Sequence, residues 1–181
     1  MSNPSVVFDV PSGHVKLCET PSLVLPMSVV GGLAMSAEPA QLREVGRGIA
    51  DVFVDRAKAQ LGSEGLLSSP SVLARILTET WASMGLGHIA LERWGKALTV
   101  HVSGAITDEP TLGVFVLGII ERILALLTLR PVHAMMLDQA DKHWRVLIAS
   151  ETTCKRAETL VSSGLSFADV LVQLHEPESR S

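Results

Sequence analysis

The sequence has few of the residues on which disulfide, zinc and sugar-binding sites are built. It contains two cysteines, Cys18 and Cys154, among 181 residues. Two thiols are too few for a disulfide framework or a zinc site, so we expect both to be free and buried. The sequence also has no tyrosine, the residue that binding surfaces commonly use to combine a ring with a hydroxyl group. That absence argues against a dedicated carbohydrate-binding face.

Charged residues are scarce, and positive charge is scarcer than negative. Asp, Glu, Lys and Arg make up 19% of the sequence, and the formal net charge is −4. There is no run of Lys or Arg that could neutralise the phosphates of a nucleic acid. We therefore exclude a nucleic-acid groove.

No apolar run is long enough to form a transmembrane segment. Residues 112–127 come nearest, but they contain Glu121 and Arg122 and fall short of the roughly 20 apolar residues that a span needs. Residues 1–20 lack a signal-peptide pattern, because no basic segment precedes an apolar one. We expect a cytoplasmic protein, with an inner-membrane-associated complex as a further option and the periplasm less favoured.

Apolar residues, in contrast, are plentiful. They make up 47% of a chain whose length fits one domain with a substantial core. A large core would explain this surplus, and so would an oligomer that hides part of its exterior. We divide the chain into an N-terminal arm (residues 1–37) with short β-prone pieces at 6–10 and 14–18, a core domain (38–150), and a C-terminal helical extension with a polar tail (151–181).

The first long helix is expected at residues 39–61, with Gly62 ending it. Its apolar residues recur every three or four positions, which places them on one face. Gly46 lies within this apolar stripe, whereas Gly48 lies on the other side of the helix. Each glycine should cost about 0.5–1 kcal/mol relative to alanine. We expect Gly46 to allow close packing inside the subunit, and Gly48 to serve a neighbouring subunit or a bend.

A second helix is expected at residues 70–84, and a β-hairpin follows it. Apolar residues alternate on both sides of Gly95-Lys96, which fits a two-residue type II′ turn with glycine first. Placing the two apolar sets face to face puts Leu91 opposite Val100.

The remaining pattern completes an α+β domain, in which an antiparallel sheet of hairpins packs against a central apolar helix and the N-terminal long helix. The central helix starts at Pro110 and has apolar residues on nearly every side. After it we expect strands at 132–137 and 143–149 joined by a turn at 138–142, then helices at 153–163 and 167–175.

The face of the first hairpin that points away from the core carries the candidate site residues for a ligand, a glucan chain or an interface: His88, Glu92, Trp94, Thr99 and His101. Two histidines with a carboxylate can bind a metal. However, no HxH or HxxxH spacing occurs, and the proposed register places the two histidines diagonally, so we expect no metal and no other cofactor. We interpret Glu121 and Arg122 as a local ion pair at the edge of the central helix.

Nothing in the sequence selects a catalytic group. There is no nucleophile elbow, and the glycines of the first helix lack the strand and the Gly-Lys-Ser/Thr ending of a phosphate loop. We therefore expect a protein that is not an enzyme.

Two blocks carry a family resemblance: Leu-Arg-Glu-Val-Gly-Arg-Gly-Ile-Ala at residues 42–50 and Met-Gly-Leu-Gly-His-Ile-Ala-Leu-Glu at 84–92. With the strand at 97–102 and the helix at 112–127 that contains Gly118, they resemble the bacterial cellulose synthase operon protein D family. The resemblance implies a non-catalytic accessory subunit of a cellulose or exopolysaccharide synthesis machine.

That family implies a homo-oligomer, a ring-like octamer built from dimers, which guides or organises nascent glucan chains. Other cellulose-synthesis proteins would be its partners. In such an assembly Arg43, Arg47 and Gly48 are the candidate subunit-interface residues.

A weaker resemblance is to 4-vinyl reductase-type ligand-binding domains. It rests on Leu25-Pro26, the glycine-rich first helix, the hairpin after Gly85 and Gly87, and a buried helix before a final hairpin. The bacterial members often carry metal-binding cysteines in the last hairpin, and this sequence has none there. The alternative function is therefore a small-molecule-binding or protein-interaction module that acts as a dimer, with an apolar ligand held between the first helix and the sheet.

Overall fold

The computed structural model describes residues 6–9, 11, 14–17, 20–22, 27–68, 70–95, 97–105, 110–128 and 130–175. In these ranges the elements are, in chain order, β1 (Val6–Asp9), β2 (His14–Leu17), β3 (Thr20–Ser22), α1 (Met27–Ser36), α2 (Pro39–Ser68), α3 (Pro70–Ser83), β4 (His88–Trp94), β5 (Ala97–Ser103), α4 (Pro110–Thr128), β6 (His133–Ala140), β7 (His143–Ala149), α5 (Glu151–Ser162) and α6 (Phe167–His175).

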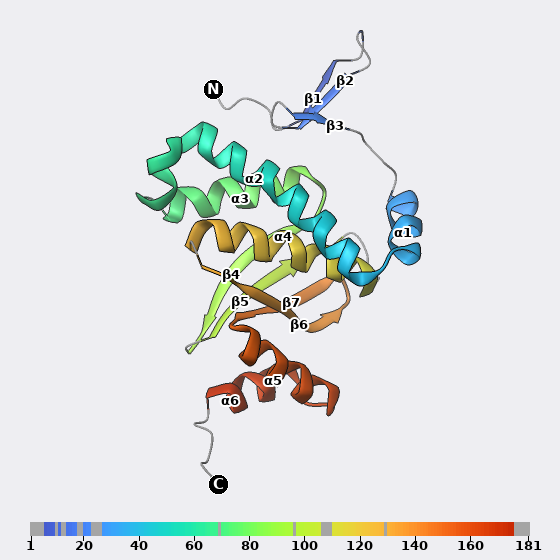
Figure 1. The fold of residues 1–181 in the computed structure, drawn as a ribbon, viewed down its shortest axis with the longest axis vertical. Coiled ribbons are helices and arrows are strands. Elements are labelled where there is room, and N and C mark those ends of the chain that lie inside the picture. Colours follow the sequence, from blue (N-terminus) through green and yellow to red (C-terminus); the bar gives the residue numbers. More distant parts are fainter. Residues whose placement is uncertain are drawn as a thin grey trace.

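The core of the fold is a four-stranded antiparallel sheet with the order β4-β5-β7-β6, and helices cover both of its faces (Figure 1). Helix α4 packs on one face, with α2 and α3 beyond it, and α5 and α6 lie on the other face. This arrangement confirms the predicted α+β class. Strands β1, β2 and β3 form a separate small sheet; β1 and β2 fall on the predicted β-prone pieces, and β3 was not predicted.

The first hairpin has the register that its alternating residues predict. Leu91 pairs with Val100, and the pairing continues to Trp94 opposite Ala97. Gly95 has a φ of 60°, a conformation that favours glycine. The turn type also depends on Lys96, which lies outside the described residues.

Helix α2 is longer than the sequence pattern predicts. We expected Gly62 to end it, but the helix continues to Ser68. Residues 62–68 contain no proline, and the next proline, Pro70, disfavours helical backbone at the residue before it. A glycine can end a helix but does not have to, so the prediction for Gly62 was wrong.

Helices α2 and α4 pack closely through two glycines. A Cβ atom built at Gly46 of α2 would overlap the carbonyl oxygen of Phe115 in α4, and one built at Gly118 of α4 would overlap the carbonyl oxygen of Arg43 in α2. The expected packing role of Gly46 inside the subunit is confirmed. A Cβ atom at Gly48 would meet no other atom within 4 Å.

The second hairpin turns later and more tightly than predicted. Strand β6 runs on to Ala140, which pairs with His143, so the turn consists of Asp141 and Lys142 rather than residues 138–142. Both turn residues have positive φ angles, 51° and 60°, as a two-residue type I′ turn requires. A bulge after Met136 shifts the register of β6 and was not visible in the sequence.

Burial of the thiols can be tested for one cysteine. Cys154 on α5 is buried, as expected, and its burial raises the pKa of the thiol. Cys18 lies outside the described residues. In the part of the chain that the structure describes, no helix combines the length and the apolar character that crossing a bilayer requires.

Candidate functional site

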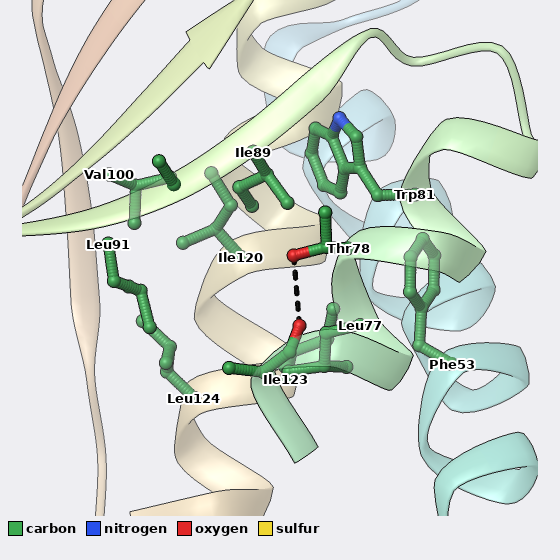
Figure 2. Close-up of a pocket in the computed structure, with 12 residues that line it drawn as sticks. Phe53, Leu77, Thr78, Trp81, Ile89, Leu91, Val100, Ile120, Ile123 and Leu124 are labelled. Carbon is green, nitrogen blue, oxygen red and sulfur yellow. Dashed lines mark hydrogen bonds between the residues drawn. The ribbon is translucent and has the colours of Figure 1, made fainter. Parts of the chain in front are cut away.

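An apolar cavity of about 230 Å³ lies where α3, the β4–β5 hairpin and α4 meet (Figure 2). It is lined by Phe53, Ala74, Leu77, Thr78, Trp81, Ile89, Ala90, Leu91, Val100, Ile120, Ile123 and Leu124. None of these described lining residues is ionisable in the physiological pH range. The chemistry that this cavity offers is therefore the burial of apolar surface.

The local sequence explains why these side chains face one space. On α3 the lining residues Ala74, Leu77, Thr78 and Trp81 are three or four positions apart, which puts them on one side of the helix. Strand β4 contributes Ile89 and Leu91, which alternate with residues of the opposite sheet face. The cavity thus forms where a helix face and a sheet face meet without filling the space between them.

The cavity has a closed end and an open end. Figure 2 shows Trp81 and Phe53 at one end of the group and Leu91 and Leu124 at the other. The Trp81 and Phe53 rings are buried and lie 6.0 Å apart between centroids. Leu91 is 51% exposed, so the cavity reaches the surface beside the edge strand β4.

Among the described lining residues, two side chains carry polar atoms, and each already donates a hydrogen bond within the protein. The Thr78 hydroxyl donates to the carbonyl oxygen of Ala74 at 2.9 Å. The Trp81 indole nitrogen donates to the carbonyl oxygen of Leu86 at 2.9 Å. Because these donors are satisfied, the cavity keeps its apolar character.

The volume suits a molecule of one ring. Protein interiors contain few voids larger than a water molecule. An engineered apolar cavity of about 150 Å³ takes up benzene. At about 230 Å³ this cavity has room for a ring with a small substituent.

The predicted polar site on the opposite sheet face is a cluster around Glu92. Its carboxylate accepts a hydrogen bond from the Trp94 indole nitrogen at 3.3 Å and lies 3.7 Å from Nδ1 of His101. Its main-chain carbonyl accepts one from the Thr99 hydroxyl at 3.3 Å. The structure thus brings four of the five predicted residues together, with His88 at the exposed start of β4.

Two neighbours of this cluster were missed. His143 on β7 stacks on His101, with ring nitrogens 3.4 Å apart. Phe167 on α6 meets the Trp94 ring edge-on, with centroids 6.0 Å apart. Both depend on how distant segments dock. Among the described residues, no three side chains of the metal-binding types gather as a metal site.

Arg43 and Arg47, predicted at a subunit interface, have a partner inside the chain. Arg47 donates to the carboxylate of Glu121 at 2.9 Å, and this hydrogen bond raises the pKa of the Arg47 guanidinium. Arg43 lies 3.7 Å from the same carboxylate. That Arg43 and Arg47, together with Gly48, also contact a neighbouring subunit stays a prediction.

The local ion pair expected between Glu121 and Arg122 was wrong. Glu121 is buried and pairs with α2, whereas Arg122 donates to Asp51 at 3.1 Å. Adjacent residues on a helix point about 100° apart, so the two side chains do not face each other.

The cavity itself could be foreseen only in outline. The sequence-based alternative placed an apolar ligand between the first helix and the sheet, and Phe53 of α2 does line the cavity. Most of the lining comes instead from α3, the first hairpin and α4. Periodicity identifies each apolar face but does not show whether two faces leave a space between them.

Comparisons with known proteins identify a fold and no family. No protein-family model matches the chain, and no curated protein matches it. Among solved structures, the phenol-responsive sensory domain of the transcription activator PoxR, determined with phenol, matches with a TM-score of 0.57 and 12% identity over 96% of this chain and 93% of that chain. A vinyl-4-reductase family protein from Methanocaldococcus jannaschii matches with a TM-score of 0.49 and 13% identity, over 71% of this chain and 83% of that one. Neither match supports the cellulose synthase resemblance, and at 12% identity the likeness to the sensory domain concerns the fold.

Proposed function

We propose that this domain binds a small, neutral, largely apolar molecule in the cavity between α3, the β4–β5 hairpin and α4. The observation that carries the proposal is the cavity itself, an apolar space of about 230 Å³ beside the hydrophobic core.

The cost of such a space favours a role for it. Residual cavities in mutant cores cost about 24 cal/mol for each cubic ångström, which corresponds to an upper limit of about 5.5 kcal/mol for a dry space of this size. Folded domains are stable by only about 5–15 kcal/mol in total. A bound apolar molecule would restore the lost contacts and offset this cost.

The fold comparison is compatible with binding. The PoxR domain, which shares the fold, is responsive to phenol and was determined with phenol. Among the residues that the structure describes around the cavity, none is ionisable and able to act as a nucleophile, acid or base in a reaction. We therefore propose a binding or sensory module rather than an enzyme.

Ligand-dependent thermal unfolding tests this function, with ethylbenzene as the probe. A ligand at about 100 times its Kd adds about 2.7 kcal/mol, which should raise the Tm by roughly 5–10 °C for a chain of this length. Ala74→Leu places extra methyl groups in the cavity and should abolish the shift. Ala82→Leu, on an exposed position of the same helix, is the matched control and should retain it. An unchanged Tm of the unmodified protein at saturating probe would contradict the proposal.

A second candidate function is that of a subunit in a cellulose-type assembly. The comparisons do not support it, but exposed apolar side chains favour a contact with another protein. Several apolar side chains of α1 and α2 are exposed, among them Leu33 at 60%, Met35 at 74% and Val45 at 55%. Apolar residues gathered on a surface commonly mark contacts with other proteins. Light scattering separates the candidates: a stable octamer is expected for a cellulose-type assembly, whereas a monomer or dimer argues against it.

A further inference from the structure

We propose that the cavity selects ligands that carry a hydrogen-bond donor, and that Thr78 is the residue that accepts this hydrogen bond. This inference rests on the proposed binding function and specifies the chemical class of its ligand. The expected ligand is a neutral one-ring or comparably small molecule with one O–H or N–H group.

The first step is the state of the Thr78 hydroxyl group. A hydroxyl has one hydrogen to donate and two lone pairs that accept. Its hydrogen is committed to the carbonyl oxygen of Ala74, four residues earlier on α3, at 2.9 Å. Toward a ligand, the Thr78 oxygen can therefore act only as an acceptor. Figure 2 shows Thr78 between the two ends of the cavity, where a ligand of this size would pass it.

The second step is the lack of a free side-chain donor among the described lining residues. The other lining side chain with a polar atom is Trp81, whose indole N–H already donates to Leu86. The remaining lining side chains are hydrocarbon. A ligand with an acceptor but no donor would lose its hydrogen bonds to water and gain none from these side chains.

The third step concerns charge. None of the described side chains around the cavity is charged, so among them an ionised ligand would find no counter-charge. Burying an unpaired charge is far more costly than burying a neutral polar group. Carboxylates and ammonium ions are therefore excluded, and an ionisable ligand should bind in its neutral form.

Three probes with the same number of non-hydrogen atoms test this selection by calorimetry. Ethylbenzene has no polar atom, anisole has an ether oxygen that only accepts, and benzyl alcohol has a hydroxyl that donates. The measured affinity of each probe is first corrected for its free energy of transfer from water. On the corrected scale, one hydrogen bond raises the affinity by about five- to tenfold. On that scale benzyl alcohol should bind about fivefold more tightly than either anisole or ethylbenzene, which form no hydrogen bond to Thr78.

Thr78→Val replaces the hydroxyl with a methyl group of similar size and should remove the preference for benzyl alcohol while keeping the binding of ethylbenzene. Thr78→Ser keeps a hydroxyl and should restore the preference. Thr159→Val is the matched control, because Thr159 makes the same hydrogen bond to the residue four positions earlier, at 3.1 Å, on the distant helix α5. It should bind all three probes like the unmodified protein.

The outcomes separate the selection from the binding function. If the unmodified protein binds all three probes with equal affinity after correction for transfer from water, the cavity binds ligands but Thr78 does not select them. A preference for benzyl alcohol that survives in Thr78→Val would likewise overturn this inference alone. If none of the three probes binds the unmodified protein, the proposed function fails, and the inference about Thr78 fails with it.

Discussion

Replacing Gly46 with alanine should destabilise the domain by about 2 kcal/mol or more, whereas the same substitution at Gly48 should stabilise it by about 0.5–1 kcal/mol. At Gly46 the added methyl group would overlap the carbonyl oxygen of Phe115, which belongs to the backbone of α4 and cannot rotate away. At Gly48 the methyl group would meet nothing within 4 Å. Alanine then contributes only its better helix propensity.

Two effects oppose each other at Gly46, and their magnitudes decide the sign. Alanine gains about 0.5–1 kcal/mol because it restricts the unfolded chain more than glycine does. Forcing extra atoms into a well-packed contact costs about 1–3 kcal/mol, and more where the opposing atoms are backbone. The overlap therefore outweighs the propensity gain. Gly118→Ala should behave like Gly46→Ala, because its methyl group would overlap the carbonyl oxygen of Arg43 on the facing helix.

Urea unfolding followed by circular dichroism measures these differences, provided that the denaturant slope is unchanged between variants. Gly48→Ala serves as the control for the general effect of adding a methyl group to α2. A Gly46→Ala protein as stable as the Gly48→Ala protein would show that the two helices do not meet at this point.

Much of this fold follows from local patterns in the sequence. The register of the first hairpin was predictable because one sheet face must be apolar and a glycine stands where the chain turns with positive φ. The same logic placed Gly46 in a packed contact, since a costly glycine inside an apolar stripe needs a reason. These features depend on residues that are close together in the sequence.

Features that depend on distant segments were not predictable in the same way. The partner of Glu121 is set by the way α2 lies across α4, so it could not be read from Arg122 beside it. The stacking of His101 on His143 needs the pairing of β5 with β7. The cavity is the extreme case, because it is a space left between faces that are each correctly predicted to be apolar.

Glu121→Leu should cost about 3 kcal/mol of stability, because it removes the carboxylate that joins α4 to α2 and β6. One oxygen of Glu121 accepts from Arg47, and the other accepts from the main-chain N–H of Ala134 at 2.9 Å. The carboxylate is only 3% exposed. Removing one partner of a buried ion pair costs about 3–5 kcal/mol. The Arg43 and Arg47 side chains are 33% and 38% exposed, so water can reach them, which favours the lower end of that range.

Two further variants separate the charge from the hydrogen bond. Glu121→Gln keeps an oxygen that can accept from Ala134 and should cost about 1–2 kcal/mol. Arg122→Gln is the matched control, since its ion pair with Asp51 is exposed and should change stability by less than about 1 kcal/mol. A Glu121→Leu loss no larger than that of Arg122→Gln would show that the buried network does not stabilise the domain.

The dependence of unfolding on protein concentration distinguishes the internal role of Arg43 and Arg47 from the interface role predicted by the sequence. Contacts within one chain stabilise it equally at every concentration, whereas contacts between subunits stabilise the folded state more as concentration rises. If the two arginines act through Glu121, the loss in Glu121→Leu should be the same at low and high concentration. A loss of stability that grows with protein concentration would instead indicate an interface role. In that case Glu121 would hold the two arginines in position for contact with a neighbouring subunit.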